Sequence, residues 1–177
     1  MNDPVTAGTP VRSEIVPAAV RWLWLAVLVV ALDQASKAWI VANLELYQTL
    51  TVAPFFEIIR THNTGAAFSF LAGASGWQRW LFIGLGVAVS IGVPVWLRRA
   101  NPGPLVAAGL SFIVGGALGN VIDRVWQGHV IDFLHFHYRS FDFPAFNVAD
   151  SSITVGAAFL ILDVLLDMRR KPRPPAG

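Results

Sequence analysis

Residues 105–124 read Leu105-Val-Ala-Ala-Gly-Leu-Ser-Phe-Ile-Val-Gly-Gly-Ala-Leu-Gly-Asn-Val-Ile-Asp-Arg124, with no charged side chain before Asp123. A helix needs about 20 apolar residues to cross ~30 Å of hydrocarbon, so the run from Leu105 to about Ile122 predicts a membrane span. Asn120, Asp123 and Arg124 form a polar group at one end of that run. The stretch therefore indicates a membrane fold with a polar site at a membrane boundary.

Three further apolar segments have a comparable length. They run from Trp22 to about Leu44, from Trp77 to Leu97 and from about Val148 to Leu166. The composition agrees, because 55% of the 177 residues are hydrophobic and 14% are charged, whereas soluble domains carry about 25% charged residues. We expect a single integral membrane domain of four transmembrane helices.

Other interpretations of the chain are less favoured. The run from Trp22 to Leu32 has the length of the apolar region of a cleaved signal peptide. Asp33, Gln34 and Lys37 follow it in place of a small-x-small cleavage site, so we expect a retained helix. The absence of cysteine excludes thiol catalysis and disulfides. The net charge of +2 comes from scattered or terminal basic residues, so no nucleic-acid partner is expected.

The basic residues indicate how the four spans are oriented. Three places that a four-span bundle puts on one side carry Arg12, Arg21, Arg98, Arg99, Arg169, Arg170, Lys171 and Arg173. Cytoplasmic segments are enriched in Lys and Arg, so we expect both tails, residues 1–20 and 171–177, to be cytoplasmic. The residues with chemical potential fall on the opposite side, so an active site would face outward.

Two segments on the expected outer side do not follow a helical pattern. From Tyr47 to Thr61 the chain is rich in β-branched and aromatic residues, which predicts short strands in a small outer β-sheet. From Phe133 to Phe146 the aromatic density is typical of a loop along the lipid headgroups, with a turn within residues 140–144. We expect the Tyr47–Thr61 sheet to close as a lid over a substrate that arrives between the helices.

Asp132 and Asp150 lie just outside hydrophobic spans, and an ionisable side chain costs roughly 2.5 to 3.5 kcal/mol at the centre of a membrane helix on insertion scales. They are therefore candidates for function. Two carboxyl groups brought together share one proton, which leaves a carboxylate that can activate water and an acid that can polarise a carbonyl. This chemistry needs no metal and no cofactor. The aromatic segment must fold back to unite the two acids, which are eighteen positions apart.

Each acid also has a simpler interpretation. Asp150 could be only the N-cap of the fourth helix, because Asp is favoured at helix starts. Asp132 could form a structural ion pair with Arg124 or Arg139. On the residues alone, these interpretations and the catalytic one remain open.

Two other features could serve packing alone. In the third span, the step from Gly115 to Gly119 has the small-xxx-small pattern that lets helices approach closely. These glycines lead directly into the polar group that begins at Asn120. In the first span, Asp33 and Lys37 are four residues apart, so they share one helix face and are expected to neutralise each other as a structural pair.

Two further functions can be weighed against acid catalysis. A metal ion could be held by the histidines His62, His129, His135 and His137. The sequence has no His-Glu-x-x-His spacing, and we expect no metal. A proton-coupled transporter could use Asp33, Asp123 and Asp132 as a relay, but a relay needs acids at the midplane and the spans show no inverted repeat.

Five sequence blocks carry a resemblance to a known family. They are Asp33-Gln34-x-x-Lys37, Asn63-Thr64-Gly65-Ala66-Ala67-Phe68, the stretch from Gly115 to Arg124, Val130-Ile131-Asp132-Phe133 and Phe146-Asn147-Val148-Ala149-Asp150. In this order they resemble the motifs of bacterial lipoprotein signal peptidases, the type II signal peptidases. The resemblance runs from about Asp33 to Asp150, and no block departs from the family pattern.

The resemblance implies an aspartic endopeptidase of the bacterial inner membrane, which removes the signal peptide from diacylglyceryl-modified prolipoproteins directly before the lipidated cysteine. The expected partners are that substrate and membrane lipid, and we expect a monomer. By the same resemblance, Asp132 and Asp150 are the catalytic pair, and Asp123 would pair with Arg124 or Lys37. The residues implied to bind substrate or support the site are Asp33, Lys37, Asn63, Gly65, Asn120, Asp123, Arg124 and Asn147.

Overall fold

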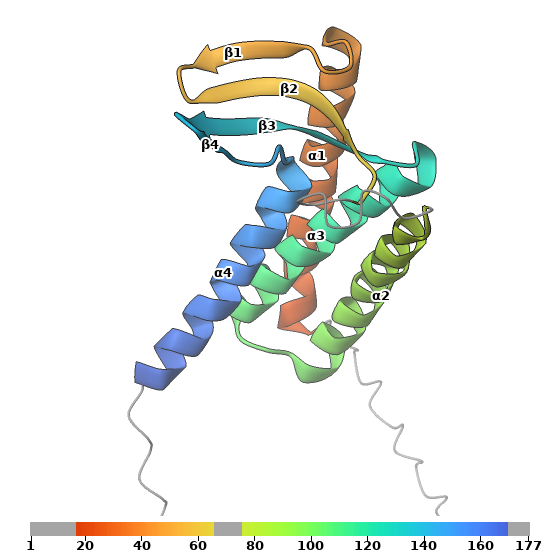
Figure 1. Cartoon of the computed structure of the whole chain (residues 1–177). Coiled ribbons are helices and arrows are strands. Elements are labelled where there is room, and N and C mark those ends of the chain that lie inside the picture. The colour runs from red at the N-terminus through yellow and green to blue at the C-terminus, as the bar shows by residue number, and fades with distance from the viewer. Residues whose placement is uncertain (1–16, 66–75, 170–177) are drawn as a thin grey trace, which may run out of the picture.

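A computed structural model describes residues 17–65 and 76–169 of the chain, so the expectations for residues 66–68, 1–16 and 170–177 lie outside it. Within the described residues, four helices are long and apolar enough to cross a membrane (Figure 1). The first begins as a 3-10 helix, η1 (Ala18–Leu23), and continues as α1 (Trp24–Asn43). The others are α2 (Trp77–Ala100), α3 (Pro104–Trp126) and α4 (Val148–Arg169). The last three extend one to four residues beyond the expected segments, whereas the first begins four residues before Trp22 and ends one residue before Leu44.

Helix α3 lies between its neighbours and contacts α1, α2 and α4 (Figure 1). Its glycines allow the close approach, since a methyl group at Gly115 would lie 2.9 Å from the Ala26 carbonyl oxygen of α1. A methyl group at Gly116 would meet the backbone of Ala149 in α4. The polar end of α3 is thereby brought against the first turn of α4.

A four-stranded antiparallel sheet lies across one end of the helices (Figure 1). The hairpin of β1 (Thr49–Ala53) and β2 (Phe56–Asn63) forms where the sequence predicted strands. Strands β3 (Val130–Tyr138) and β4 (Phe141–Asp142) follow α3, and the strand order is β1-β2-β3-β4. The β2–β3 register places Thr61 opposite Asp132, which lies near the start of β3.

The aromatic segment from Phe133 to Phe146 differs from the expected loop. Its first part continues β3 through Tyr138, because this backbone pairs with β2 and the Phe56 and Phe136 rings stack with centroids 4.6 Å apart. The chain then turns back into the short strand β4 and returns irregularly toward α4. Aromatic residues suit the pleated surface of a strand as well as the headgroup region, so composition alone predicted the wrong element.

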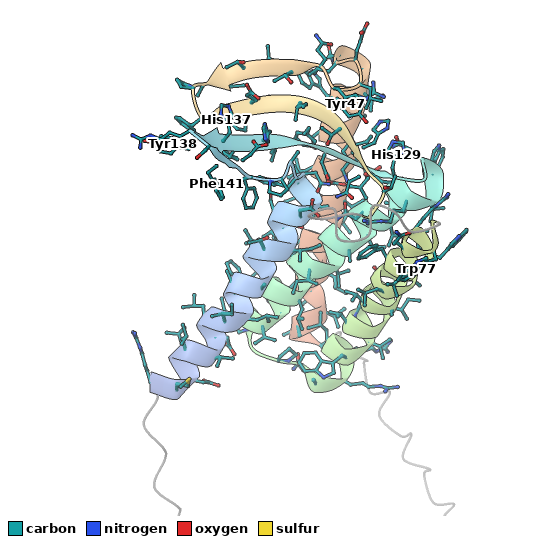
Figure 2. All side chains as sticks on the ribbon, viewed as in Figure 1. Tyr47, Trp77, His129, His137, Tyr138 and Phe141 are labelled. Carbon is teal, nitrogen blue, oxygen red and sulfur yellow. The ribbon has the colours of Figure 1, made fainter. Side chains whose placement is uncertain are left out.

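The sheet is continuous, which alters the lid expected from Tyr47–Thr61. Those residues form β1 and most of β2, and β2 is hydrogen-bonded to the aromatic strand β3. Figure 2 shows Tyr138 and Phe141 at the free end of the sheet, beyond the helices. A lid made of β1 and β2 alone would have to break the β2–β3 pairing, so we no longer expect that segment to move by itself.

A small apolar cluster anchors the sheet to the helices. Ile40 and Leu44, at the end of α1, pack against Ile131 and Phe133 of β3, and all four are buried. Because side chains alternate along a strand, Asp132 points to the opposite face from these two β3 neighbours. Packing of the cluster therefore fixes the backbone that carries Asp132.

Candidate active site between the sheet and the helix ends

Asp132 is 2% exposed, and hydrogen bonds reach both of its carboxylate oxygens. Asn147 Nδ2 donates to Oδ1 at 2.7 Å, and Asn63 Nδ2 donates to Oδ2 at 3.0 Å. Thr61, opposite in β2, donates its hydroxyl to the Asp132 carbonyl oxygen at 3.2 Å. Contacts from two elements far apart in the sequence therefore orient this carboxyl group.

Asp150 lies in the first turn of α4, and its Oδ1 accepts a hydrogen bond from Asn120 Nδ2 at 2.8 Å. The residue that caps this helix is Asn147, whose Oδ1 accepts the Asp150 N–H at 2.9 Å. The capping role considered for Asp150 thus belongs to Asn147. The Asp150 side chain is left to face the site, at a helix end where the dipole favours negative charge.

Two asparagine amides connect the acids. Asn147 Nδ2 lies 2.7 Å from Asp132 Oδ1 and 3.3 Å from Asn120 Oδ1. Asn120 Nδ2 in turn donates to Asp150 Oδ1 at 2.8 Å. The orientation of the Asn147 amide is determined, because its oxygen already accepts the Asp150 N–H. The structure therefore brings together Asp132 and Asp150 through residues at the ends of α3 and α4.

Gly65 fixes the third amide, at the end of β2. Its N–H donates to Asn63 Oδ1 at 2.8 Å, which turns Asn63 Nδ2 toward Asp132. The φ of Gly65 is +113°, and a Cβ there would lie 3.1 Å from the Phe82 ring. Glycine adopts this backbone conformation without the penalty that other residues incur.

Burial raises the pKa of the Asp132 carboxyl to about 7, and the charge of Asp150 adds to the rise. Hydrogen bonds from Asn63 and Asn147, and the charge of Lys37, lower the pKa without offsetting burial. A carboxyl group in this range holds a proton in a substantial fraction of molecules at neutral pH. The influence of Asp150 indicates that the two carboxyl groups lie within electrostatic reach of each other, as a shared proton requires.

Both acids line a cavity of about 760 Å³ between the sheet and the helices. Its wall includes Asn63, Gly65 and Arg124. The Arg124 guanidinium lies 4.8 Å from the centre of the Phe82 ring and donates to the Asn120 carbonyl oxygen at 3.4 Å. The volume falls in the ~300–1,000 Å³ range of ligand sites. The cavity thus offers two acids, amide donors and a cation to a bound molecule.

Lys37 forms two buried ion pairs next to the acids. Its Nζ lies 2.7 Å from Asp33 Oδ2 and 2.8 Å from Asp123 Oδ2. The expected pairing of Asp33 with Lys37 is confirmed, and Lys37 is the partner of Asp123. Arg124, the other partner considered for Asp123, instead lines the cavity.

Three residues that contact the site residues were not assigned a role from the sequence. Gln34 Nε2 donates to Asp123 Oδ1 at 2.9 Å, and its place in the first sequence block was the available signal. Thr61 and Phe82 contact the Asp132 backbone and Arg124, respectively. No local pattern marks these two, because their roles depend on strand register and on the approach of α2 to α3.

The four histidines lie in or directly next to strands β2 and β3. His62 and His129 stack with ring centroids 3.6 Å apart, and burial lowers the pKa of both. His135 contacts Glu57 of β2 at 3.4 Å and Asp142 of β4 at 2.7 Å. Across residues 17–65 and 76–169, no three His, Cys, Asp or Glu side chains are grouped so that they could hold a metal ion.

Residues 25–166 match the family described as signal peptidase (SPase) II, and they contain all the acids and amides of the cavity. The chain belongs to the signal peptidase II family. Signal peptidase II enzymes are aspartic peptidases, so the resemblance and the enzyme class expected from the five blocks are confirmed.

Relatives of signal peptidase II type cover most of the chain. The chain is 52% identical over 146 residues to the lipoprotein signal peptidase of Pseudomonas aeruginosa, and the match covers 81% of this chain and 86% of the relative. It is 50% identical over 145 residues to that of Shewanella halifaxensis, covering 81% and 85%. A solved bacterial membrane enzyme superposes with a TM-score of 0.76 at 31% identity, covering 89% of this chain and 94% of that one. A transporter function is not supported by these matches.

Proposed function

We propose that this protein cleaves the signal peptide from prolipoproteins that carry a diacylglyceryl group, directly before the lipidated cysteine. Membership of the signal peptidase II family supports this function, as do the relatives named lipoprotein signal peptidase. The observation that carries the proposal is a pair of carboxyl groups, Asp132 and Asp150, that line one cavity and are bridged by asparagine amides. Such a pair can hydrolyse a peptide bond through an activated water.

The surroundings of the two acids support different starting states. Asp132 is buried and has a pKa of about 7, so it can hold the shared proton. Asp150 lies at the N-terminus of α4 and shares the cavity with the Arg124 guanidinium. The helix dipole and a nearby cation both favour a carboxylate. We therefore assign Asp132 as the initial acid and Asp150 as the initial base.

The proposed reaction has two steps. In the first, Asp150 takes a proton from water as the water oxygen bonds to the scissile carbonyl carbon, and Asp132 gives its proton to the carbonyl oxygen. In the second, the carbon–nitrogen bond breaks, the leaving nitrogen receives the proton from Asp150, and Asp132 recovers a proton from the hydroxyl formed on the carbonyl. Both acids return to their starting states.

The other polar residues divide into two groups. Asn63, Gly65 and Arg124 line the cavity, and we assign them to binding the substrate backbone near the scissile bond. The residues assigned to orienting the acids or supporting the site are Asn120, Asn147, Asp33, Lys37 and Asp123. We assign them this role because they are buried or half-buried and contact either the acids or one another.

The protein is an integral membrane protein with four helices able to span the bilayer within the described residues. We propose the bacterial inner membrane, with both termini cytoplasmic and the cavity on the outer side. The basic residues Arg98 and Arg99, at the end of α2 opposite the sheet, support this orientation. The enzyme would act as a monomer, because one chain supplies both acids, and the substrate would arrive sideways with its acyl chains in lipid.

The proposed function is tested by incubating the purified protein with a diacylated precursor peptide and measuring the masses of the products. We expect two fragments, one of which begins with the lipidated cysteine. The same precursor without its diacylglyceryl group serves as the comparison and should be cut far more slowly. Absence of cleavage of the diacylated precursor, or cleavage at another bond, would refute the proposal.

A further inference from the structure

Lys37 is a buried cation that the proposed reaction does not use. It is 2% exposed, and its two carboxylate partners, Asp33 and Asp123, are 0% and 1% exposed. The three groups lie in helices α1 and α3, which pack against each other, and all three are buried. An ion cluster in such surroundings is weak evidence for stability, because desolvating the charges offsets much of their attraction.

Each of the two carboxylates also accepts a hydrogen bond from a backbone N–H, and each of these N–H groups lies one residue before a proposed catalytic acid. Asp33 Oδ1 accepts the N–H of Ala149 at 2.9 Å, and Ala149 directly precedes Asp150. Asp123 Oδ2 accepts the N–H of Ile131 at 3.3 Å, and Ile131 directly precedes Asp132. Each catalytic acid therefore follows a residue whose N–H is bound by a carboxylate that Lys37 holds.

Further contacts make the cluster one unit. Gln34 Nε2 donates to Asp33 Oδ2 at 3.1 Å and to Asp123 Oδ1 at 2.9 Å, so it ties the carboxylates to each other. Lys37 Nζ lies 3.4 Å from Oδ1 of Asn120, the residue whose amide nitrogen binds Asp150. The packing leaves little freedom, since a Cβ at Gly119 would lie 2.5 Å from Asp33 Oδ2.

We propose that Lys37, with Asp33 and Asp123, is a positioning device that sets the separation of the two catalytic carboxyl groups. One ammonium group on α1 is the common reference point for the start of α4, which carries Asp150, and the start of β3, which carries Asp132. The inference rests on the proposed function. It adds that the distance between acid and base is set by a cluster that touches neither the substrate nor the reacting atoms.

Positioning and stability can be separated by substitution. Leucine branches at the same carbon as aspartate, and replacing a whole buried ion cluster by apolar residues is often neutral for stability. The triple variant Asp33→Leu/Lys37→Met/Asp123→Leu removes the charges and the two amide acceptors together. The triple variant Asp33→Asn/Lys37→Met/Asp123→Asn removes the charges but keeps side-chain oxygens that can accept the two N–H groups.

The experiment measures kcat and KM for the diacylated precursor, per folded enzyme, with thermal unfolding in detergent as the folding check. We expect the leucine triple variant to lose about 10²-fold in kcat, because a displacement of about 1 Å between catalytic groups has that effect. Its KM should stay within about threefold, because the cavity wall is unchanged. The asparagine triple variant should lose clearly less. Ser111→Ala, which removes another buried polar side chain of α3, should match wild type.

A folded leucine triple variant with kcat within about threefold of wild type would overturn the positioning role. A loss seen only in KM would also overturn it. If that variant does not fold, kcat and KM of the double variant Asp33→Leu/Lys37→Met are judged by the same criteria. This double variant keeps the net charge of the cluster and removes the acceptor of the Ala149 N–H. The wild-type reaction in the same assay separates the two proposals, because failure of wild type to cleave counts against the proposed function.

Discussion

The Asp132 carboxyl group lies between opposing influences. Burial and the charge of Asp150 raise its pKa, hydrogen bonds from Asn63 and Asn147 lower it, and the result is about 7. The pKa of a group balanced in this way changes when any one of these contacts is lost. The pH dependence of the enzyme should therefore follow the residues that touch Asp132.

Cleavage is expected to fall as the pH rises through about 7, because Asp132 then loses the proton that polarises the scissile carbonyl. Asn63→Ala removes a hydrogen bond that favours the ionised form, so the pKa of Asp132 should rise. The alkaline limb of kcat/KM against pH should then move upward by roughly one unit. A limb that stays in place or moves to lower pH in the variant would contradict the assignment of Asp132 as the acid.

At this scale the sequence singled out the two proposed catalytic acids, but it left their contact partners open. Asp123 and Arg124 are adjacent, so their side chains point about 100° apart around a helix, and only one of them can face Lys37. The choice depends on where α1 lies, which no local pattern records. The amide bridge from Asn147 to Asn120 was likewise beyond prediction, because it joins the ends of two helices.

Among the elements, α3 determines the geometry of the site because it packs closely against α1 and α4. The atoms facing Gly116 are the Ala149 carbonyl oxygen, the Ser152 hydroxyl and the Ile153 side chain. All three belong to the first turns of α4, which carry Asp150. Any increase in the α3–α4 separation would therefore move one acid relative to the other.

Gly116→Ala tests this packing. The added methyl group should push α4 away and destabilise the protein by about 1–3 kcal/mol, the usual effect of overpacking. We expect a lower unfolding temperature in detergent and a lower kcat. Gly84→Ala in α2 is the matched control, because nothing lies within 4 Å of a methyl group there. Equal stability and activity of the two variants would show that the α3–α4 contact does not determine the site.

The elements themselves were predictable to different degrees. Helix length and hydropathy identified each of the four long helices found in the described part of the chain, because a span must be long and apolar whatever its neighbours are. The aromatic segment from Phe133 was expected to be a loop, although β3 continues to Tyr138. Strand formation there depends on pairing with β2, some 75 residues earlier, which aromatic density cannot reveal.

At the scale of the whole molecule, the sheet lies over one end of the helices (Figure 1). The residues that line the polar site include residues from the sheet and from helices α2, α3 and α4. The loop between α2 and α3 lies at the other end, next to Arg98 and Arg99. In the proposed orientation the sheet faces outward and this loop faces the cytoplasm.

Cysteine labelling tests the orientation without background labelling of the protein itself, because the chain has no cysteine of its own. Thr51→Cys places a thiol on the exposed strand β1, and Ala100→Cys places one at the exposed end of α2. In spheroplasts, a membrane-impermeant maleimide should label the first variant, and label the second only after the inner membrane is opened. The reverse pattern would refute the proposed orientation.

In the proposed catalytic centre, two carboxyl groups share a proton at one site. The most direct measurement is cleavage of the diacylated precursor by purified Asp132→Asn and Asp150→Asn, followed by product mass, with wild type alongside. An amide can neither donate that proton nor activate water, so each variant should lose roughly 10³-fold or more in kcat while its thermal unfolding shows that it remains folded. If either folded variant cleaves the precursor at a rate near that of wild type, the pair is not the catalytic centre.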